Sequence, residues 1–240
     1  MPTQNKFAVL VINSGSSSVK FTLFGIKDEK VLAKGIVERI CLEGTQIAYT
    51  PYHGKKLTRA VTVSNARDAV SKIVECLVHE EHGVIESSSA VAAIGHRVVH
   101  GGEKIHTSVI IDQNVKNIIE EYFILAPLHN PPNLEGIEAC ERIFSDVPQV
   151  AVFDTAFHAT LPEHAYLYGL PYHLYTEDKV RRYGFHGTSH RYVSCEAAKF
   201  VGRPLKNLKI ITCHMGNGTS ITAVDGGMSV DTSMGFTPLE

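Results

Sequence analysis

The sequence predicts an α/β protein in which a mixed sheet is flanked by helices, followed by the beginning of a second domain of the same kind. Three observations predict this fold class. Three short apolar segments open the chain, strand and helix patterns then alternate, and a glycine turn near the start recurs about two hundred residues later. Strands separated by helices indicate parallel pairing with right-handed crossovers, whereas the opening segments indicate antiparallel pairing.

Three antiparallel strands are predicted at the start, because short apolar runs there are separated by turn-forming stretches. A Gly/Ser turn follows the first run, and the polar stretch GIKDEK follows the second. This spacing is typical of a meander. The predicted strands cover residues 7–12, 19–24 and 31–40.

A helix is predicted next, because apolar residues recur at helical spacing from Ala66 to Val78. Asn65 is a suitable N-cap, and Asp68 falls in the first turn. Strand and helix patterns then alternate. The later strands are predicted at residues 92–96 and 150–153, and the later helices at residues 115–123 and 188–201.

A second glycine turn near the end of the sequence matches the first. The segment INSGSSSV, which starts at Ile12, aligns with CHMGNGTS, which starts at Cys213. A repeat of this kind indicates a duplicated domain, the alternative being two unrelated Gly-rich hairpins. We therefore predict an N-terminal domain over residues 1–206 and the first strands of a second domain over residues 207–240. Because the helices that should cover the second sheet are missing, the sequence is expected to be the N-terminal fragment of a longer protein.

The overall composition is that of a soluble globular protein, with 44% hydrophobic residues, 20% charged residues and a formal net charge of -2. A nucleic-acid or anionic-membrane partner would require a basic excess, which is absent, whereas a small anionic metabolite needs only a local positive pocket. The N-terminus lacks a signal-peptide pattern and no apolar run is long enough to span a bilayer. We therefore predict a cytoplasmic protein with neither nucleic acid nor membrane as a partner.

Cysteine and histidine spacing does not indicate a metal site. The five cysteines show no CxxC spacing and are expected to be reduced core residues. His96 and His100 have the four-residue spacing of a helical metal pair, but Val98 and Val99 between them favour a strand, so ordinary loop histidines are the preferred interpretation.

The two glycine turns are candidate phosphate-binding turns. Gly15 and Gly216 would allow close approach of the backbone, Ser16 and Ser18 could hydrogen-bond phosphoryl oxygens, and Lys20 would supply a positive charge. The spacing of a P-loop is absent. Taken alone, the pattern is weak evidence for phosphate binding, because Gly/Ser hairpins are usually just turns.

Polar residues also gather where strands are predicted to end, which is where ligands bind in α/β sheets. Arg97 ends one strand, His129 and Asn130 fall in a loop that we expect to be locked by prolines, and Asp154 follows a buried strand. An acidic residue in that position needs a cation or a donor, so Asp154 is the strongest single candidate; its alternative is a helix cap or turn residue.

One further turn carries a candidate catalytic group. His186 lies between glycines just before a predicted helix, where a donor could stabilise charge on a transferring group. Arg181 and Arg182 could do the same, but a pair of surface arginines is the preferred interpretation.

Seven motifs together resemble the acetokinase family of the sugar kinase, heat-shock cognate and actin superfamily. They occur in family order over most of the chain. The motifs are VINSGSSSVK, IGHRVVHGGE, APLHNPPN, VAVFDTAFH, RRYGFHGTSH, HMGNGTS and VDTSMGFTPLE. The resemblance implies actin/ribonuclease H-like βββαβαβα domains, with ATP and a carboxylate in the cleft between them. It also implies transfer of the γ-phosphoryl group of ATP to acetate, giving acetyl phosphate and ADP.

The resemblance further implies roles for individual residues. Mg²⁺, or Mn²⁺, is expected near Asn13. The residues expected to act in catalysis are Arg97, His129, Asp154 and His186. Those expected to contact nucleotide phosphates are Ser16, Ser18, Lys20, His214, Met215, Gly216, Asn217 and Gly218. Arg97 is expected to bind the carboxylate, and the pocket for the acyl methyl group is expected to comprise Val99, Leu128, Phe185 and Pro238.

Physical chemistry narrows the role of Asp154. A carboxylic acid with a pKa near about 4.3 is already ionised at neutral pH, so the acceptor needs no general base. Asp154 is therefore expected to act through Mg²⁺ or by orienting other groups. A propionate kinase and a non-catalytic actin-like binding domain are the alternatives. The 240 residues alone are expected to be inactive or nearly so and to be monomeric, whereas the resemblance implies that full-length family members are dimers.

Overall fold

The structure is a computed structural model that describes residues 6–238. The chain divides into two compact units. The first unit comprises the chain up to Val98 together with Val109–Phe123 and Pro127–Ala151. The second comprises Val99–Ser108, Ile124–Ala126 and the chain from Val152 onward. The predicted domain boundary between residues 206 and 207 stays a prediction.

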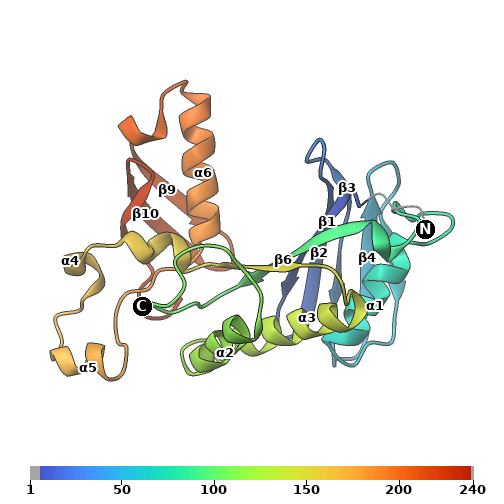
Figure 1. The fold of residues 1–240 in the computed structure, drawn as a ribbon, viewed down its shortest axis with the longest axis horizontal. Coiled ribbons are helices and arrows are strands. Elements are labelled where there is room, and N and C mark those ends of the chain that lie inside the picture. The colour runs from blue at the N-terminus through green and yellow to red at the C-terminus, as the bar shows by residue number, and fades with distance from the viewer. Residues whose placement is uncertain (1–5, 239–240) are drawn as a thin grey trace. The chain divides into compact units, whose positions relative to one another are not determined.

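A mixed eight-stranded sheet, ordered β5-β4-β3-β2-β1-β6-β8-β7, forms the first unit and confirms the expected sheet type (Figure 1). Strand β1 pairs antiparallel with β2 and parallel with β6. The strands are β1 (Ala8–Ser14), β2 (Ser18–Gly25), β3 (Val31–Glu38), β4 (Gln46–Pro51), β5 (Leu57–Ala60), β6 (Val91–Val98), β7 (Val109–Ile110) and β8 (Gln149–Phe153). The predicted three-stranded meander is confirmed, and it continues for two further antiparallel strands, β4 and β5.

Two helices, α1 (Ala66–Leu77) and α3 (Asn130–Ile143), pack side by side against this sheet (Figure 1). The predicted N-cap of α1 is confirmed, because Asn65 Oδ1 accepts a hydrogen bond of 2.9 Å from the Asp68 amide. Helix α2 (Gln113–Glu121) is capped in the same way by Asp112. A single apolar cluster between the sheet and the helices α1 and α3 forms the core of this unit.

The expectation that His129 and Asn130 lie in a proline-locked loop is wrong for Asn130, because α3 begins there. His129 takes the N-cap position, and the two prolines that follow Asn130 fall in the first turn. Proline is well tolerated there, since the first helical N–H groups have no partner within the helix. Asn130 is buried and donates to the Ile119 carbonyl at 3.1 Å. Asn133 donates to the carbonyl of Ser14, which attaches the start of α3 to the end of β1.

The second unit contains an antiparallel sheet ordered β11-β10-β9, against which helix α6 (Gly187–Phe200) packs through β9 (Figure 1). The strands are β9 (Lys209–Met215), β10 (Thr219–Asp225) and β11 (Met228–Thr232). The short helices are α4 (Glu163–Tyr166) and α5 (Tyr172–Thr176). The 3-10 helices of the two units are η1 (Ser88–Ala90), η2 (Tyr122–Ile124), η3 (Ala156–Thr160) and η4 (Leu205–Asn207).

The glycine turns join corresponding hairpins in the two units. Residues 15–17 connect β1 to β2, and residues 216–218 connect β9 to β10. The pairing differs by one residue, because Ser14 faces Val19 whereas Met215 faces Thr219. The two hairpins therefore agree in strand order and in turn position, as a structural repeat requires.

The sheet of the second unit has an unusual buried layer of hydroxyl side chains instead of a purely apolar interior. Alternating residues on the strands place these hydroxyls on one face. The side chains, each at most 3% exposed, are Thr212, Ser220, Thr222, Ser229 and Thr232. Buried hydroxyls need hydrogen-bond partners, and the histidines described below supply several of them.

The cysteines only partly match their prediction. All five are free, and Cys76 and Cys140 are buried as expected. Cys41 and Cys213 are exposed, so the expectation of a core position is wrong for these two. Among residues 6–238, no helix is both long and apolar enough to cross a membrane.

Candidate active site

Three site residues of the first unit share one face of its sheet. Asn13 on β1 is the direct cross-strand partner of Lys20 on β2. Ile12 pairs with His96 on the parallel strand β6. The next residues along the two strands, Asn13 and Arg97, therefore lie at the same level. Asn13, Lys20 and Arg97 therefore point to the same side, opposite to the face that packs against α1 and α3. Two cationic side chains on one face supply the local positive charge that a small anionic ligand needs.

The first glycine turn is tight and well anchored. The Gly15 amide donates to the Ser18 carbonyl at 2.8 Å, and Ser16 at the tip is exposed. On the other side of β1, Ser14 packs directly on α3, where a Cβ at Gly136 would come within 2.7 Å of the Ser14 Cβ. Glycine at position 136 thus allows the close approach of helix and strand that holds the turn in place.

The strongest candidate of the second unit, Asp154, directly follows β8 and is only 2% exposed. Its carbonyl oxygen accepts a hydrogen bond of 2.9 Å from the Gly187 amide at the start of α6. A Cβ at Gly187 would lie 2.3 Å from that same oxygen, so only glycine fits. This contact holds Asp154 next to His186, the N-cap residue of α6.

His186 has a left-handed backbone conformation, with φ 58° and ψ 21°. Such a conformation is uncommon outside glycine and concentrates at functional sites, because it costs roughly 1–3 kcal/mol. The imidazole Nδ1 lies 2.8 Å from the Ser220 hydroxyl oxygen. The ring stacks on His214 with centroids 4.0 Å apart, and a Cβ at Gly218 would lie 3.0 Å from its Cε1 atom. The second glycine turn therefore lies beside His186.

The rest of that turn is open to solvent. Met215, Gly216 and Asn217 are exposed, and the Gly216 amide donates to the Gly218 carbonyl at 3.0 Å. His214 is held by a hydrogen bond of 2.9 Å between its Nδ1 and the Ser189 hydroxyl oxygen on α6. The structure thus brings together, within one unit, the residues from which the sequence predicted a phosphate loop and a charge-stabilising histidine.

The residues expected to form the acyl pocket are distributed over both units. Val99 and Phe185 form a small buried cluster with Met234 in the second unit. Pro238 is exposed in that unit, and Leu128, in the first unit, is 73% exposed. His129 is exposed and also belongs to the first unit. The pocket assignment stays a prediction.

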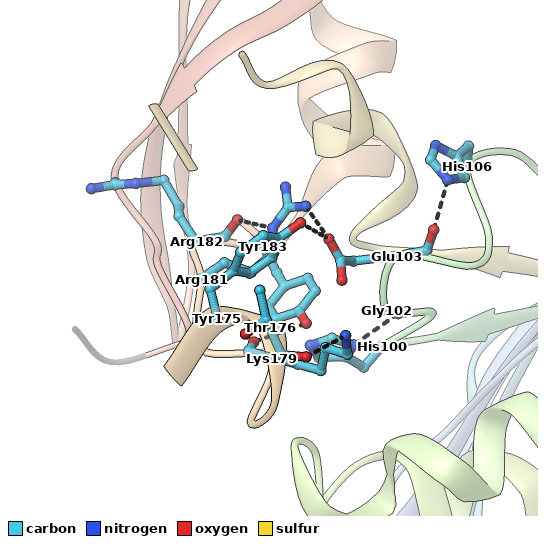
Figure 2. A network of polar contacts seen from close by, with 10 residues as sticks. All are labelled: His100, Gly102, Glu103, His106, Tyr175, Thr176, Lys179, Arg181, Arg182 and Tyr183. Atoms are coloured by element: carbon cyan, nitrogen blue, oxygen red, sulfur yellow. Dashed lines mark hydrogen bonds and ion pairs between the residues drawn. The ribbon is translucent and has the colours of Figure 1, made fainter. Parts of the chain in front are cut away.

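The interpretation of Arg181 and Arg182 as surface arginines is wrong for Arg181, whereas Arg182 is half-buried. Arg181 is 9% exposed and pairs with Glu103 at 2.7 Å, while its guanidinium lies 3.7 Å from the centre of the Tyr166 ring. Tyr175 donates to the same Glu103 oxygen at 2.9 Å (Figure 2). Arg182 donates to the carbonyl of Thr232. This network anchors the segment that follows β6, which includes Val99, within the second unit.

Four of the described histidines are buried, and burial is the main reason why each pKa is lowered to about 4. They are His96, His100, His158 and His190. His96 lies on β6 and contacts Gln149 through its Nε2 atom, so the interpretation of His96 as a loop histidine is wrong. His158 is held by the Ser229 hydroxyl at 2.8 Å and the Phe185 carbonyl at 2.9 Å. Within residues 6–238, no group of three or more His, Cys, Asp or Glu side chains could hold a metal ion.

These buried histidines predict a loss of stability in mild acid. A histidine in the unfolded chain titrates near about 6.5, so between about pH 6.5 and pH 4 the unfolded chain binds more protons than the folded one. The free energy of unfolding is therefore expected to fall as pH drops through this window and to be independent of these groups above it. Urea titrations across the window measure the effect. His96→Gln should reduce the pH dependence of the free energy of unfolding, whereas His173→Gln, at an exposed position, should leave it unchanged. A wild-type free energy of unfolding that stays constant across this pH window would contradict the prediction.

Several residues next to His186 were missed by the sequence reasoning. Ser220, His190 and Thr212 contact one another or His186, although none of them belongs to the predicted site. The period-two recurrence of Ser220 and Thr222 along β10 is a signal that could have indicated a buried polar face. Which residues these hydroxyls contact depends on the packing of α6 against the sheet, and no local sequence pattern predicts that packing.

Each unit offers an oxygen donor of the type that Mg²⁺ prefers. Mg²⁺ is usually bound by one or two carboxylates together with water and substrate phosphates, rather than by a complete protein cage. The first unit offers the side-chain amide oxygen of Asn13, and the second offers the buried carboxylate of Asp154. Each residue by itself therefore fits Mg²⁺ in its chemistry.

Comparison with known proteins agrees with these features. The acetate kinase of Alkaliphilus metalliredigens is 55% identical over 232 residues, which cover 97% of this chain and 59% of that protein. The crystal structure of Porphyromonas gingivalis acetate kinase superposes with a TM-score of 0.93 at 46% identity, covering 98% of this chain and 59% of that one. A propionate kinase from Francisella tularensis superposes with a TM-score of 0.89 at 43% identity and equal coverage.

The chain thus spans about 59% of the length of the relatives it matches. The family model of the acetokinase family matches residues 8–240, which includes both glycine turns, Asp154 and His186. The mixed sheet flanked by helices confirms the expected actin-like fold. The chain therefore belongs to the acetokinase family.

Proposed function

We propose that this protein transfers the γ-phosphoryl group of ATP reversibly to acetate, giving acetyl phosphate and ADP. Family membership supports the reaction class. One structural observation carries the proposal: the hydrogen bond between Gly187 and Asp154 holds a buried carboxylate residue next to His186, beside a glycine turn. A scaffold domain has no need of that combination.

In the proposed reaction, the protein acts by positioning and charge neutralisation, because the transition state of phosphoryl transfer is loose. Arg97 binds the acetate carboxylate, for which a guanidinium offers paired donors. His186 stabilises negative charge on the transferring phosphoryl group. Backbone amides and hydroxyls of the turns at Ser16 and Gly216 contact nucleotide phosphates. The acceptor is already ionised at neutral pH, so no general base is assigned.

When bound, Mg²⁺ would neutralise phosphate charge, and Asp154 is proposed to act through it. Asp154→Asn keeps the size of the side chain but removes its charge. We expect kcat at saturating Mg²⁺ to fall by about 10²–10³, the usual effect of losing one group that stabilises charge. Steady-state kinetics measure this effect. Asp178→Asn, at an exposed position of the same unit, is the matched control. A near-normal rate for Asp154→Asn would contradict the assigned role.

The identity of the acid is tested with acetate, propionate and butyrate as competing acceptors. A propionate kinase is the second candidate, because the propionate kinase from Francisella tularensis has the same fold. One additional methylene group changes the transition-state free energy by only about 1–3 kcal/mol, so kcat/KM values must be compared directly. The highest kcat/KM for acetate supports the proposal, the highest for propionate favours the alternative, and no phosphoryl transfer to any of the three favours a non-catalytic domain.

The homodimeric state and the inactivity of residues 1–240 on their own stay predictions. Capture of acyl phosphate with hydroxylamine, using a polypeptide of these residues with Mg·ATP and acetate, measures the latter directly.

A further inference from the structure

The Ser220 hydroxyl connects two histidines of the second unit. Its oxygen lies 2.8 Å from His186 Nδ1 and 2.7 Å from His190 Nε2, and the residue is fully buried. A hydroxyl has one hydrogen, so Ser220 can donate to only one of the two nitrogens and must accept from the other. The proton positions of the two imidazole rings are therefore coupled.

The far side of His190 determines the direction of this coupling. His190 Nδ1 lies 2.7 Å from the Thr212 hydroxyl oxygen, which in turn lies 3.4 Å from the Thr222 carbonyl oxygen. A carbonyl can only accept, so this longer contact favours an arrangement in which the Thr212 hydrogen points to Thr222. In that arrangement, His190 Nδ1 carries a hydrogen and donates it to Thr212.

The remaining hydrogens follow from the neutral state of His190. Burial lowers the pKa of His190 to about 4, so the ring carries one proton at neutral pH. With that proton on Nδ1, its Nε2 accepts from the Ser220 hydroxyl. Ser220 then accepts from His186, whose Nδ1 must carry a hydrogen. The donors run from His186 through Ser220, His190 and Thr212 to the Thr222 carbonyl.

We propose that Ser220, His190 and Thr212 are positioning residues that keep a proton on His186 Nδ1, so that His186 donates a hydrogen bond from Nε2 only as the imidazolium. The part concerning phosphoryl transfer rests on the proposed function. A cationic ring places a full positive charge, rather than a neutral N–H dipole, beside the transferring group, and charge-assisted hydrogen bonds are the stronger ones. The neutral ring presents an unprotonated Nε2.

The opposite direction of the chain is the competing arrangement. Thr212 would then donate to His190, Ser220 would donate to His186, and the neutral His186 would carry its proton on Nε2. The two arrangements differ in which ring nitrogen of each histidine is protonated. Nitrogen chemical shifts of the imidazole rings distinguish a protonated from an unprotonated ring nitrogen, so the difference can be observed directly.

The test uses the protein labelled with ¹⁵N-histidine, at a pH at which His186 is neutral and without nucleotide. The signals of His186 and His190 are assigned by their loss in His186→Gln and His190→Gln. We expect protonated Nδ1 and unprotonated Nε2 in both rings. An Nε2-protonated His186 in the wild type would overturn the proposal. The variants serve only to assign the signals, and the protonation states are measured in the wild-type protein.

Thr212→Val and Thr212→Ser form a matched pair. Valine removes the acceptor for His190 Nδ1 at nearly constant shape, so both histidines should move their proton to Nε2. Serine keeps the hydroxyl and should keep the wild-type pattern. An unchanged His186 pattern in a folded Thr212→Val protein would overturn the proposal. The nitrogen shifts are measured without catalysis, so the two hypotheses can fail separately. Protonated Nδ1 atoms in a protein without kinase activity would refute only the proposed function. A His186 protonated on Nε2 in an active kinase would refute only this inference.

Discussion

Gly187→Ala is expected to lower the free energy of unfolding by about 3 kcal/mol and to reduce phosphoryl transfer at least about 10²-fold. The new Cβ would lie 2.3 Å from the Asp154 carbonyl oxygen and 2.9 Å from the Phe157 Cβ. Both neighbours are close to the backbone, so relief requires α6 to move away from β8. Such a shift would also break the 2.9 Å hydrogen bond from Gly187 to Asp154.

The activity loss follows from the same displacement. Asp154 and His186 are held together by this one close contact, and an error of about 1 Å in the placement of catalytic groups can cost about 10² in rate. Urea denaturation and steady-state kinetics measure the two effects. Gly169→Ala is the matched control, because nothing lies within 4 Å of a Cβ at that exposed position of the same unit. Equal stability and equal activity for the two variants would show that α6 tolerates the extra carbon.

His186→Asn is expected to reduce kcat by about 10²–10³ while changing the free energy of unfolding little. Asparagine is one of the few residues that adopts the left-handed conformation readily, so the backbone at φ 58° is preserved. Its shorter side chain cannot place a donor where the imidazole does. The substitution also removes the stacking on His214 and the contact with Ser220. Because the backbone conformation is kept while the imidazole is lost, the variant separates the chemical role of the ring from its role in the fold.

The measurement compares kcat and KM for acetate with the thermal unfolding midpoint. His173→Asn, at an exposed position on α5, is the matched control and should keep the wild-type kcat. A His186→Asn enzyme with the wild-type kcat would show that the ring does not act on the transferring group. A variant that loses stability and activity together would assign it a structural role instead.

Local sequence patterns were sufficient to predict the helices and strands whose caps, turns and apolar periodicity are visible in the sequence itself. Helix α1 has an N-cap, an acidic first turn and a continuous apolar face, and the structure begins it at Ala66, directly after Asn65. The opening meander was recognised by its apolar runs and turns. Strand β5 was not recognised, because all four of its residues are exposed and no buried face marks it in the sequence. Helix α3 was missed because its prolines are typical of loops as well as of first helical turns.

In the candidate site, too, some residues could be identified from the sequence and others only from the tertiary structure. Asp154 stood out in the sequence because a charged residue that ends an apolar strand is unusual, and the two glycine turns stood out because the same turn recurs. His186 stood out because it lies between glycines just before a predicted helix. The partners of His186 could not. Ser220, His190 and Thr212 come from three different elements, and their hydrogen bonds exist only because α6 packs on the hydroxyl face of the β9–β11 sheet. Residue type and spacing indicate which groups can react, whereas hydrogen-bond direction and the exclusion of water depend on neighbours that are distant in the chain.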